Sequence, residues 1–355
     1  KEIIMFLIIT QMMNLLARLS VPFGLALSVP TVAVACAYYY RPHSSINVFE
    51  ETETSLLIKH IQRNDYILKD IEISKDRYIH TLVVSEDKHD KNKPNLVLVH
   101  GWSSGLALWG KNIDSLSDKY NIYAIDLLGF GRSSRPKFPS KATPEEAKSF
   151  WIDSIHEWKE EIFGSEKIVL LGHSLGGFLA CTYALEHPDD LDKVILAAPV
   201  GIAPFVIPPQ DGLVRKSIQS LVWDYNVTPQ AILRSFGYFS KNIWDRLGTA
   251  ANYRGLDKNG WEYLYQAQMA NGSGEHAFMK ILLKEGWGYP LYERLDNLTT
   301  PLKIIYGSHD YIRPSFGTEV LKKVPSAQLS VIENSGHHMY WTHTDEFNKA
   351  IIEFA

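Results

Sequence analysis

A serine within the segment GHSLG, at residues 172–176, is the strongest chemical signal in this chain. It follows the apolar run KIVLLG and opens a helical run that extends from Phe178 to Glu186. A nucleophile on such a tight strand-to-helix turn needs small neighbours, which explains a glycine two positions before it and another two positions after it. The turn also places the Leu175 amide at a helix N-terminus, where it can bind developing negative charge. We therefore predict Ser174 as a nucleophile and the backbone N–H of Leu175 as an oxyanion donor.

A serine hydroxyl needs an oriented base at neutral pH, and the C-terminal part of the chain offers both partners. With this turn, the acid and then the histidine follow the serine along the chain. The segment IIYGSHDY places Asp310 just after a strand-like run, and ENSGHHMYW offers His337 and His338. We predict Asp310 as the acid, although such an aspartate also suits a turn. We predict His337 as the base, because it directly follows Gly336 and precedes Phe347 by ten residues. A closing helix is expected near Phe347.

The segment His100-Gly101-Trp102 follows the apolar run NLVLV and predicts the second oxyanion donor. In enzymes of this kind the donor is the backbone N–H after the His-Gly pair, here that of Trp102. We interpret His100 as a structural hydrogen-bonding residue. We interpret Asp126, in the segment DLLGFGRSS, as a turn residue that binds local amides, because the Lys-Ser/Thr of a phosphate loop is missing. The predicted chemistry requires no cofactor and no metal ion.

Alternating strand-like and helical runs surround these residues from about Tyr66 onward. Near-continuous runs of Val, Ile and Leu predict strands covered on both faces, as in a mostly parallel sheet flanked by helices. A helix is expected from Pro144 to Gly164, with Thr143 and Glu146 forming a capping box, and another from about Asp345. The expected strands span residues 66–73, 78–85, 95–100, 121–126, 167–172, 193–199, 302–307 and 328–333.

The alternation breaks between residues 201 and 298, where aromatic helical runs occur without a clear strand. We interpret residues 201–298 as a helical lid inserted into a core formed by residues 60–200 and 299–355. Apolar lid side chains suit an acyl-chain pocket, although the same side chains would also pack the lid onto the core. They are Phe205, Val206, Ile207, Leu213, Val214, Trp223, Tyr225, Phe236, Phe239 and Trp244.

The first 45 residues form a separate hydrophobic segment, in which Arg18 is the only charged residue between Ile3 and Tyr40. Residues 19–40 are long enough to cross a bilayer, although Pro22 and Pro30 interrupt them. We predict membrane association; a signal peptide or a helix pair packed on the domain stay as alternatives. The net charge of −4 gives no basic excess for nucleic-acid binding. The two cysteines, Cys36 and Cys181, do not indicate a disulfide framework.

Taken together, several segments resemble the α/β-hydrolase subfamily of abhydrolase domain-containing proteins four and five. The resemblance extends from about residue 60 to the end of the chain. It implies an α/β-hydrolase fold. It also implies one of two functions: a lysophospholipase that acts on N-acyl phosphatidylethanolamines, or a lipid-droplet coactivator of a triglyceride lipase. The vertebrate coactivator lacks the nucleophilic serine, so Ser174 favours the hydrolase branch. The matching segments are HGW…GLALW, YAIDLLGFGRSSRPKF, SIHEWKEEI, LLGHSLGGFLA, SGEHAF, GWGYPLYERL and HHMYWTHTDEFN.

Two positions depart from these relatives. In several of them an aspartate follows the catalytic histidine after four intervening residues, a pattern associated with acyltransferases, and here that position is Thr342. Some also place the acid later in its loop, where this chain has Arg313. Sequence and resemblance together predict a serine hydrolase of (lyso)phospholipid esters, with N-acyl phosphatidylethanolamines as candidate substrates. The alternatives are a lipase coactivator or scaffold and a lysophospholipid acyltransferase. The expected location is a membrane, at the cytoplasmic face of the endoplasmic reticulum or a lipid droplet, with a lipase or droplet protein as a further partner.

Overall fold

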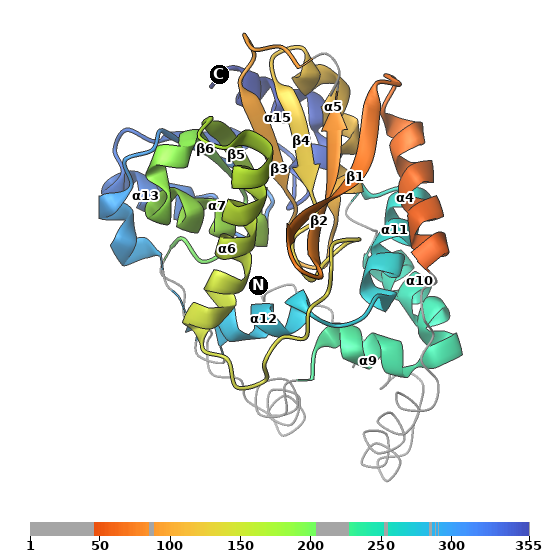
Figure 1. The fold of residues 1–355 in the computed structure, drawn as a ribbon. Coiled ribbons are helices and arrows are strands. Elements are labelled where there is room, and N and C mark those ends of the chain that lie inside the picture. Colours follow the sequence, from red (N-terminus) through yellow and green to blue (C-terminus); the bar gives the residue numbers. More distant parts are fainter. Residues whose placement is uncertain are drawn as a thin grey trace.

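A twisted sheet forms the centre of the computed structural model, which describes residues 46–84, 89–203, 227–251, 255–283, 286–287, 289 and 291–354 (Figure 1). Its eight strands are ordered β1-β2-β4-β3-β5-β6-β9-β10. β1 and β2 are antiparallel to their neighbours, and all pairs from β4 to β10 are parallel, which confirms the predicted mostly parallel sheet. The strands are β1 (Tyr66–Ser74), β2 (Arg77–Val84), β3 (Asn95–Val99), β4 (Asn121–Ile125), β5 (Ile168–His173), β6 (Leu191–Ala197), β9 (Leu302–Gly307) and β10 (Gln328–Ile332).

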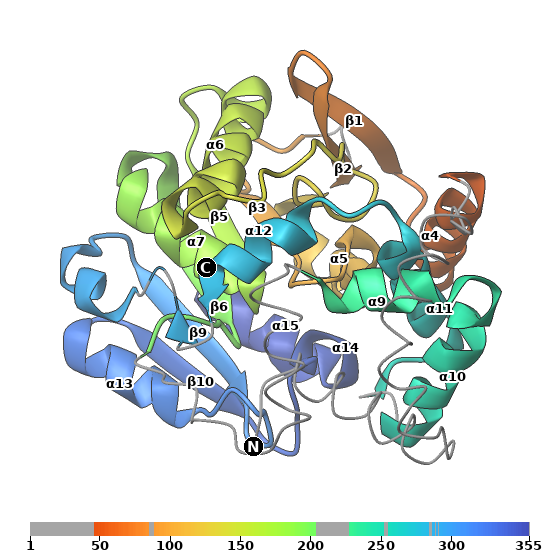
Figure 2. The same ribbon diagram turned by 90° about the horizontal axis from the view of Figure 1, so that it is seen from below.

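Helices cover both faces of this sheet, as Figures 1 and 2 show. Every residue of β3, β4, β5 and β9 is buried, which explains why these strands read as continuous apolar runs in the sequence. α6 and α7 lie on one face, and α5 and α15 lie on the other. Their bounds, with those of the neighbouring helices, are η2 (Leu106–Trp109), α5 (Gly110–Ser117), α6 (Pro144–Phe163), α7 (Leu175–Glu186), η3 (Pro188–Asp190), η7 (Tyr292–Asn297), α13 (Ser315–Lys323), α14 (Met339–Thr342) and α15 (Thr344–Ile352).

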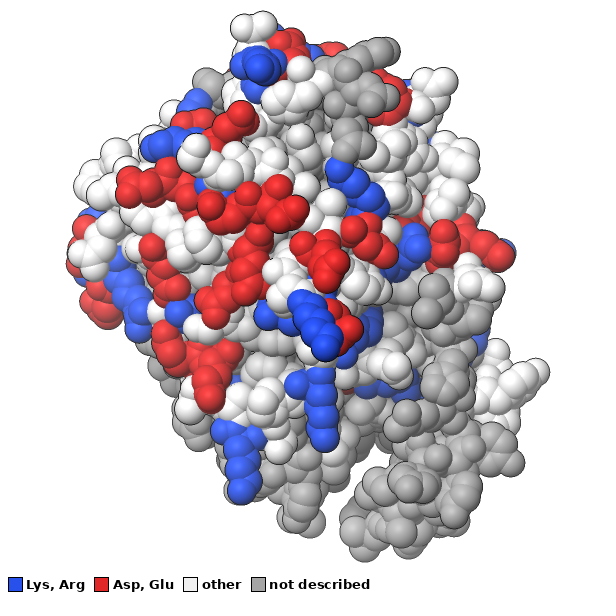
Figure 3. Space-filling view, viewed as in Figure 1, with Lys and Arg blue, Asp and Glu red and all other residues white. Residues whose placement is uncertain are grey.

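The capping box predicted for α6 is present. The backbone N–H of Glu146 donates to Thr143 Oγ1 at 3.2 Å, and the Glu146 carboxylate accepts from the Thr143 backbone N–H at 2.7 Å. The side of α6 that faces the core is apolar, and Trp151 and Trp158 are fully buried there. Acidic side chains gather over the opposite, solvent-facing side of α6 (Figure 3). This acidic surface is unsuited to a nucleic-acid backbone.

Helix α4 (Ile46–His60) was not expected from the sequence. It buries Phe49 and Leu57 against the core, but it also buries Glu53 completely. Glu53 Oε2 lies 3.1 Å from Nε2 of His80 and 2.8 Å from Nη1 of Arg132. A charged residue at a core position hides the apolar periodicity by which a helix is recognised in a sequence, and its partners lie far along the chain.

In the described residues between β6 and β9 there are four α-helices, and we call residues 227–251 and 255–281 the helical insertion. In Figure 1 the first and the last of these helices lie below the sheet, and the other two lie to its right, on the side of α4. A hairpin of two very short strands, β7 (Leu282–Leu283) and β8 (Gly286–Trp287), follows them, where no strand was expected. A lid function for residues 201–298 stays a prediction. The helices are α9 (Pro229–Ser235), α10 (Ser240–Ala251), α11 (Lys258–Met269) and α12 (Gly274–Ile281), with the turn η5 (Gly237–Phe239) between the first two.

The apolar residues that we named for the lid have different environments. Trp244 is buried and stacks on Trp261, with 3.9 Å between the ring centroids, whereas Phe239 is 63% exposed and Phe236 is half-buried. Trp244 therefore packs the insertion internally. Phe205, Val206, Ile207, Leu213, Val214, Trp223 and Tyr225 lie outside the described residues.

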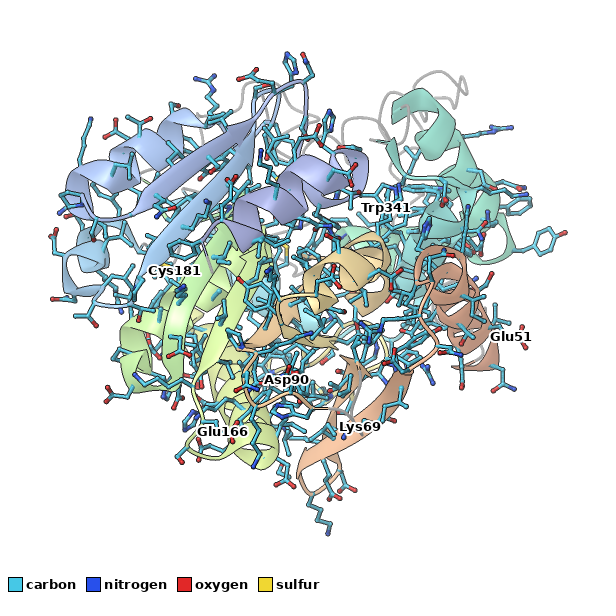
Figure 4. The ribbon with its side chains drawn as sticks, turned by 90° about the horizontal axis from the view of Figure 1, so that it is seen from above. Glu51, Lys69, Asp90, Glu166, Cys181 and Trp341 are labelled. Atoms are coloured by element: carbon cyan, nitrogen blue, oxygen red, sulfur yellow. The ribbon has the colours of Figure 1, made fainter. Side chains whose placement is uncertain are left out.

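No helix within the described ranges combines the length and apolar character needed to cross a bilayer. The hydrophobic segment of residues 1–45, including Cys36, lies outside those ranges, so its membrane association stays a prediction. Cys181 is a buried free thiol inside α7, and Figure 4 shows it in the interior while Lys69 and Glu166 extend at the periphery.

Candidate active site

Ser174 occupies the sharp turn between β5 and α7, with φ 56° and ψ −112°. A non-glycine residue with this backbone is strained and persists only where its surroundings hold it. The flanking glycines permit the turn: a Cβ on Gly172 would lie 2.0 Å from the carbonyl oxygen of Gly176. A Cβ on Gly176 would lie 2.5 Å from the backbone oxygen of His100. The steric requirement expected from the sequence is therefore met in the structure.

Backbone hydrogen bonds hold the serine turn against the neighbouring strand. The Ser174 N–H donates to the Ala197 carbonyl at 2.9 Å, and the Ser174 carbonyl accepts from Phe178 and Val200 at 3.1 and 3.2 Å. The serine is only 3% exposed. The turn is thus fixed from both sides, and Ser174 lies at the carboxyl end of a central strand.

Asp310 and His337 lie together, as their positions after β9 and β10 predict. His337 Nδ1 is 3.1 Å from Asp310 Oδ1 and 3.0 Å from Oδ2, and both side chains are almost completely buried. Asp310 Oδ1 also accepts from the backbone N–H of Ile312 at 2.8 Å, which fixes the carboxylate. A carboxylate at Nδ1 favours the tautomer with its proton there, so that Nε2 carries the lone pair.

The Nε2 atom of His337 is buried and has no hydrogen-bond partner among the described residues. In particular, no hydrogen bond joins it to the Ser174 hydroxyl there. His337 does contact the residue directly before the serine, since His173 Nε2 donates to the backbone carbonyl of His337 at 2.8 Å. The hydrogen bond between a catalytic base and its serine is often long in an unliganded enzyme and shortens only when substrate binds.

His173 is a structural contributor that the sequence did not reveal. Burial, followed by the neighbouring His337, places the pKa of His173 well below its ordinary value, so its ring is neutral. A neutral ring with its proton on Nε2 can make the observed bond to the His337 carbonyl. The signal in the sequence was its position directly before the nucleophile, which by itself indicates no role.

The two predicted oxyanion donors lie at the ends of two neighbouring parallel strands. Leu175 is the first residue of α7, where an N–H has no carbonyl of a preceding turn to bind. Trp102 lies in the loop after β3, next to Gly101, and a Cβ on Gly101 would lie 3.1 Å from the Cβ of Ser174. The loop that carries Trp102 therefore passes directly beside the serine.

The interpretations of His100 and Asp126 as structural residues are confirmed. His100 Nε2 accepts from the backbone N–H of Leu127 at 3.0 Å, and burial lowers the pKa of His100 to about 4, so the ring is neutral. Asp126 accepts from the backbone N–H groups of Leu106 and Arg132, both at 2.7 Å. Burial raises the pKa of Asp126 to about 7.

Two groups of three side chains bring possible metal-ligand atoms within 4.8 Å of one another in the described residues. In each, a lysine or arginine side chain already pairs with one carboxylate. Arg132 lies 2.8 Å from Glu53 in the buried group, and Lys159 lies 2.9 Å from Asp190 in the other. We interpret both as ion-pair clusters. The groups are Glu53, His80 and Asp126, and His156, His187 and Asp190.

Comparison with known proteins agrees with the fold. Residues 94–344 match the family model of the alpha/beta hydrolase fold. A (lyso)-N-acylphosphatidylethanolamine lipase from Bos taurus is 34% identical over 307 residues, covering 82% of this chain and 87% of the relative. The 1-acylglycerol-3-phosphate O-acyltransferase ABHD5 from Rattus norvegicus is 34% identical over 304 residues, covering 81% of this chain and 84% of the relative.

Solved structures show the same fold at lower sequence identity. The naproxen esterase of Bacillus subtilis aligns with a TM-score of 0.62 at 20% identity, covering 88% of this chain and 99% of the esterase. A bacterial membrane phospholipase A aligns with a TM-score of 0.62 at 19% identity, covering 97% of both chains. The fold and the lipase-named relatives support a hydrolase of lipids. The chain therefore belongs to the α/β-hydrolase fold family, in the group that contains the (lyso)-N-acylphosphatidylethanolamine lipases and ABHD5.

Proposed function

We propose that this protein is a serine hydrolase that cleaves acyl esters of (lyso)phospholipids, with Ser174, His337 and Asp310 as its catalytic triad. The observation that carries this proposal is the buried His337–Asp310 pair, which leaves the second ring nitrogen of His337 without a partner among the described residues, while the His337 backbone contacts His173, the residue before Ser174. A buried ring nitrogen without a hydrogen bond destabilises the protein. A hydrogen bond from the Ser174 hydroxyl to this nitrogen, formed when substrate binds, would offset that loss.

The mechanism is acyl transfer to water through an acyl-enzyme. Nε2 of His337 removes the Ser174 proton as Oγ attacks the ester carbonyl carbon. The resulting oxyanion binds the backbone N–H groups of Trp102 and Leu175. His337 then donates its proton to the leaving alcohol, and water releases the fatty acid by the same steps in the second half. Asp310 keeps the imidazole oriented and stabilises its charged form.

A phospholipid substrate is supported by the named relatives, of which one type is a (lyso)-N-acylphosphatidylethanolamine lipase. The apolar segment of residues 1–45 would place the site at a membrane or droplet surface, where such lipids occur. Lipid profiling of cells that express either the wild type or Ser174→Ala identifies the head group. We expect lysophospholipids or N-acylated forms to accumulate only with the variant.

A fluorophosphonate probe tests the nucleophile directly. We expect covalent labelling of the wild type and none of Ser174→Ala. Ser154→Ala is a suitable control, because its buried hydroxyl donates to the Trp151 carbonyl within α6, and it should be labelled like the wild type. A folded wild-type protein that resists labelling would instead support a coactivator or scaffold with an idle triad.

An acyltransferase would form the same acyl-enzyme and pass the acyl group to a lysophospholipid. The names of the ABHD5 relatives motivate a direct comparison. The position that carries aspartate in the acyltransferase pattern is Thr342, whose hydroxyl donates to the His338 carbonyl at 3.2 Å. We therefore expect water to be the acceptor, and release of free fatty acid in the presence of lysophosphatidic acid measures this.

A further inference from the structure

The loop that carries Trp102 contains a second strained residue. Ser103 has φ 62°, in the left-handed region that favours glycine. A serine keeps this backbone only where neighbouring groups hold it. The loop runs from β3 to η2. Because it is short, contacts with other parts of the chain must stabilise its backbone.

Two buried glutamines of the helical insertion hold Ser103. Gln230 of α9 donates from Nε2 to Ser103 Oγ at 2.6 Å. Gln268 of α11 donates from Nε2 to the Ser103 backbone carbonyl at 2.8 Å and accepts from Ser103 Oγ through its own Oε1. Both glutamines are about 95% buried, with exposures of 4% and 5%. These hydrogen bonds fix the side chain and the backbone of Ser103 together.

The residues on either side of Ser103 also contact the insertion. The indole of Trp102 stacks on Phe278 of α12, with the ring centroids 5.2 Å apart and the planes at 28°. Gly105 fits against Tyr263 of α11, because a Cβ at this glycine would lie 2.1 Å from the Tyr263 hydroxyl. The insertion therefore holds the loop before, at and after Ser103.

Gln268 is itself held by an ion pair inside the insertion. Arg234 of α9 donates to the Gln268 backbone carbonyl at 2.9 Å and to Glu275 of α12 at 3.0 Å. Burial opposes the ionisation of Glu275, but Arg234 and Thr228 outweigh it, so the pKa of this carboxyl lies below its usual value. The ionised pair joins α9, α11 and α12 into one support.

We propose that Gln268 and Gln230 are positioning residues that aim the Trp102 backbone N–H at the developing oxyanion. This inference rests on the proposed function and adds that the helical insertion builds half of the oxyanion site. An oxyanion donor stabilises the transition state only when its N–H already points to the place of the charge. Hydrogen bonds to Ser103 and stacking on Trp102 give the intervening peptide that fixed orientation.

Gln268→Met tests this role, because it keeps the length of the side chain and removes its hydrogen bonds. We measure kcat and KM with a soluble short-chain p-nitrophenyl ester, and the inhibition constant of a trifluoromethyl ketone, whose serine adduct carries the oxyanion. We expect kcat to fall about 10- to 100-fold, with KM changed less than about two-fold. Ketone binding should weaken by a similar factor, since the adduct resembles the transition state.

Gln266→Met is the matched control on the same helix. Gln266 is also buried, and its amide donates to Glu262 at 2.8 Å rather than to the loop. We expect its kcat and its ketone inhibition constant to stay within about two-fold of the wild type. A purely structural effect of losing a buried amide would lower the melting temperatures of both variants without separating their kcat values.

Ser103→Gly is the second variant, in case Gln268→Met does not fold. Glycine adopts a φ of 62° without strain but lacks the hydroxyl that joins both glutamines. It should also lower kcat, and the double variant should lose less than the product of the single losses, because both changes remove the same contacts. If the folded variants kept the kcat and the ketone binding of the wild type, or if only KM rose, this inference would be wrong. The proposed function would not be affected by that result. Wild-type hydrolysis that persists in Ser174→Ala would overturn the proposed function and this inference together.

Discussion

His337 Nδ1 lies at nearly equal distances from the two carboxylate oxygens of Asp310, 3.1 and 3.0 Å. An amide at position 310 would keep the shape of the side chain but would offer one donor group and one acceptor. We expect Asp310→Asn to lower kcat by about 10⁴-fold with a small change in KM, as in a protease triad in which the wrong tautomer results. Steady-state ester hydrolysis measures this, and near-wild-type turnover would assign the acid to another residue.

The turn at Ser174 should depend sharply on its first glycine. Gly172→Ala would place a methyl group 2.0 Å from the Gly176 carbonyl oxygen, so the turn must open. We expect a loss of at least ~3 kcal/mol of unfolding free energy, measured by urea denaturation. Gly336→Ala is the control, because a Cβ there meets nothing within 4 Å among the described residues, and it should change the free energy by less than about 0.5 kcal/mol. Equal stability of the two variants would show that the turn tolerates the side chain.

The buried contact between His80 and Glu53 should make stability depend on pH. Burial lowers the pKa of His80, but hydrogen bonds to Asp70 and Glu53 raise it by more, to about 10. The folded protein therefore keeps this proton where the unfolded chain, with an ordinary value of 6.5, has lost it. The stabilisation is complete below about pH 6.5 and disappears as the pH rises toward 10.

His80→Gln tests this linkage. We expect the difference in unfolding free energy from the wild type to be on the order of a few kcal/mol at about pH 6, and to shrink toward about pH 9.5. Urea denaturation of both proteins across this range provides the measurement. A difference that stays constant with pH would mean that His80 is neutral in the folded protein.

Deletion of residues 1–40 separates membrane binding from catalysis. We expect the truncated protein to leave the membrane fraction after sedimentation, because the deletion removes most of the apolar segment. Turnover of a soluble ester should stay within about two-fold, since α4 and its contacts are retained. Continued sedimentation with membranes would place the binding surface on the folded domain.

The sequence predicts the elements whose information is local. β9 has the expected bounds of residues 302–307, because a buried parallel strand reads as an apolar run. The capping box of α6 is likewise contained in a few neighbouring residues. Helix α4 was missed because the partner of its buried Glu53 at Arg132 is 79 residues away.

The candidate site shows the same division. The segments around Ser174, Asp310 and His337 were found from their order and spacing, and the His337–Asp310 hydrogen bond is present, while the three catalytic roles stay predictions. The support of Ser103 by Gln268 spans 165 residues and consists of ordinary polar side chains without a motif. Contacts of this kind depend on how the insertion folds back over the sheet, which local sequence does not specify.

The packing of α4 also determines where a membrane that binds residues 1–45 would be attached to the domain. The helix begins at Ile46, and it is fixed to the domain by buried Phe49 and by the Lys59–Asp257 ion pair at 2.5 Å. A flexible linker lets a domain rotate and move relative to its anchor, whereas a helix that is packed on the domain moves with it. The start of α4 therefore moves with the domain, and an anchor formed by residues 1–45 would attach the enzyme at this one fixed point.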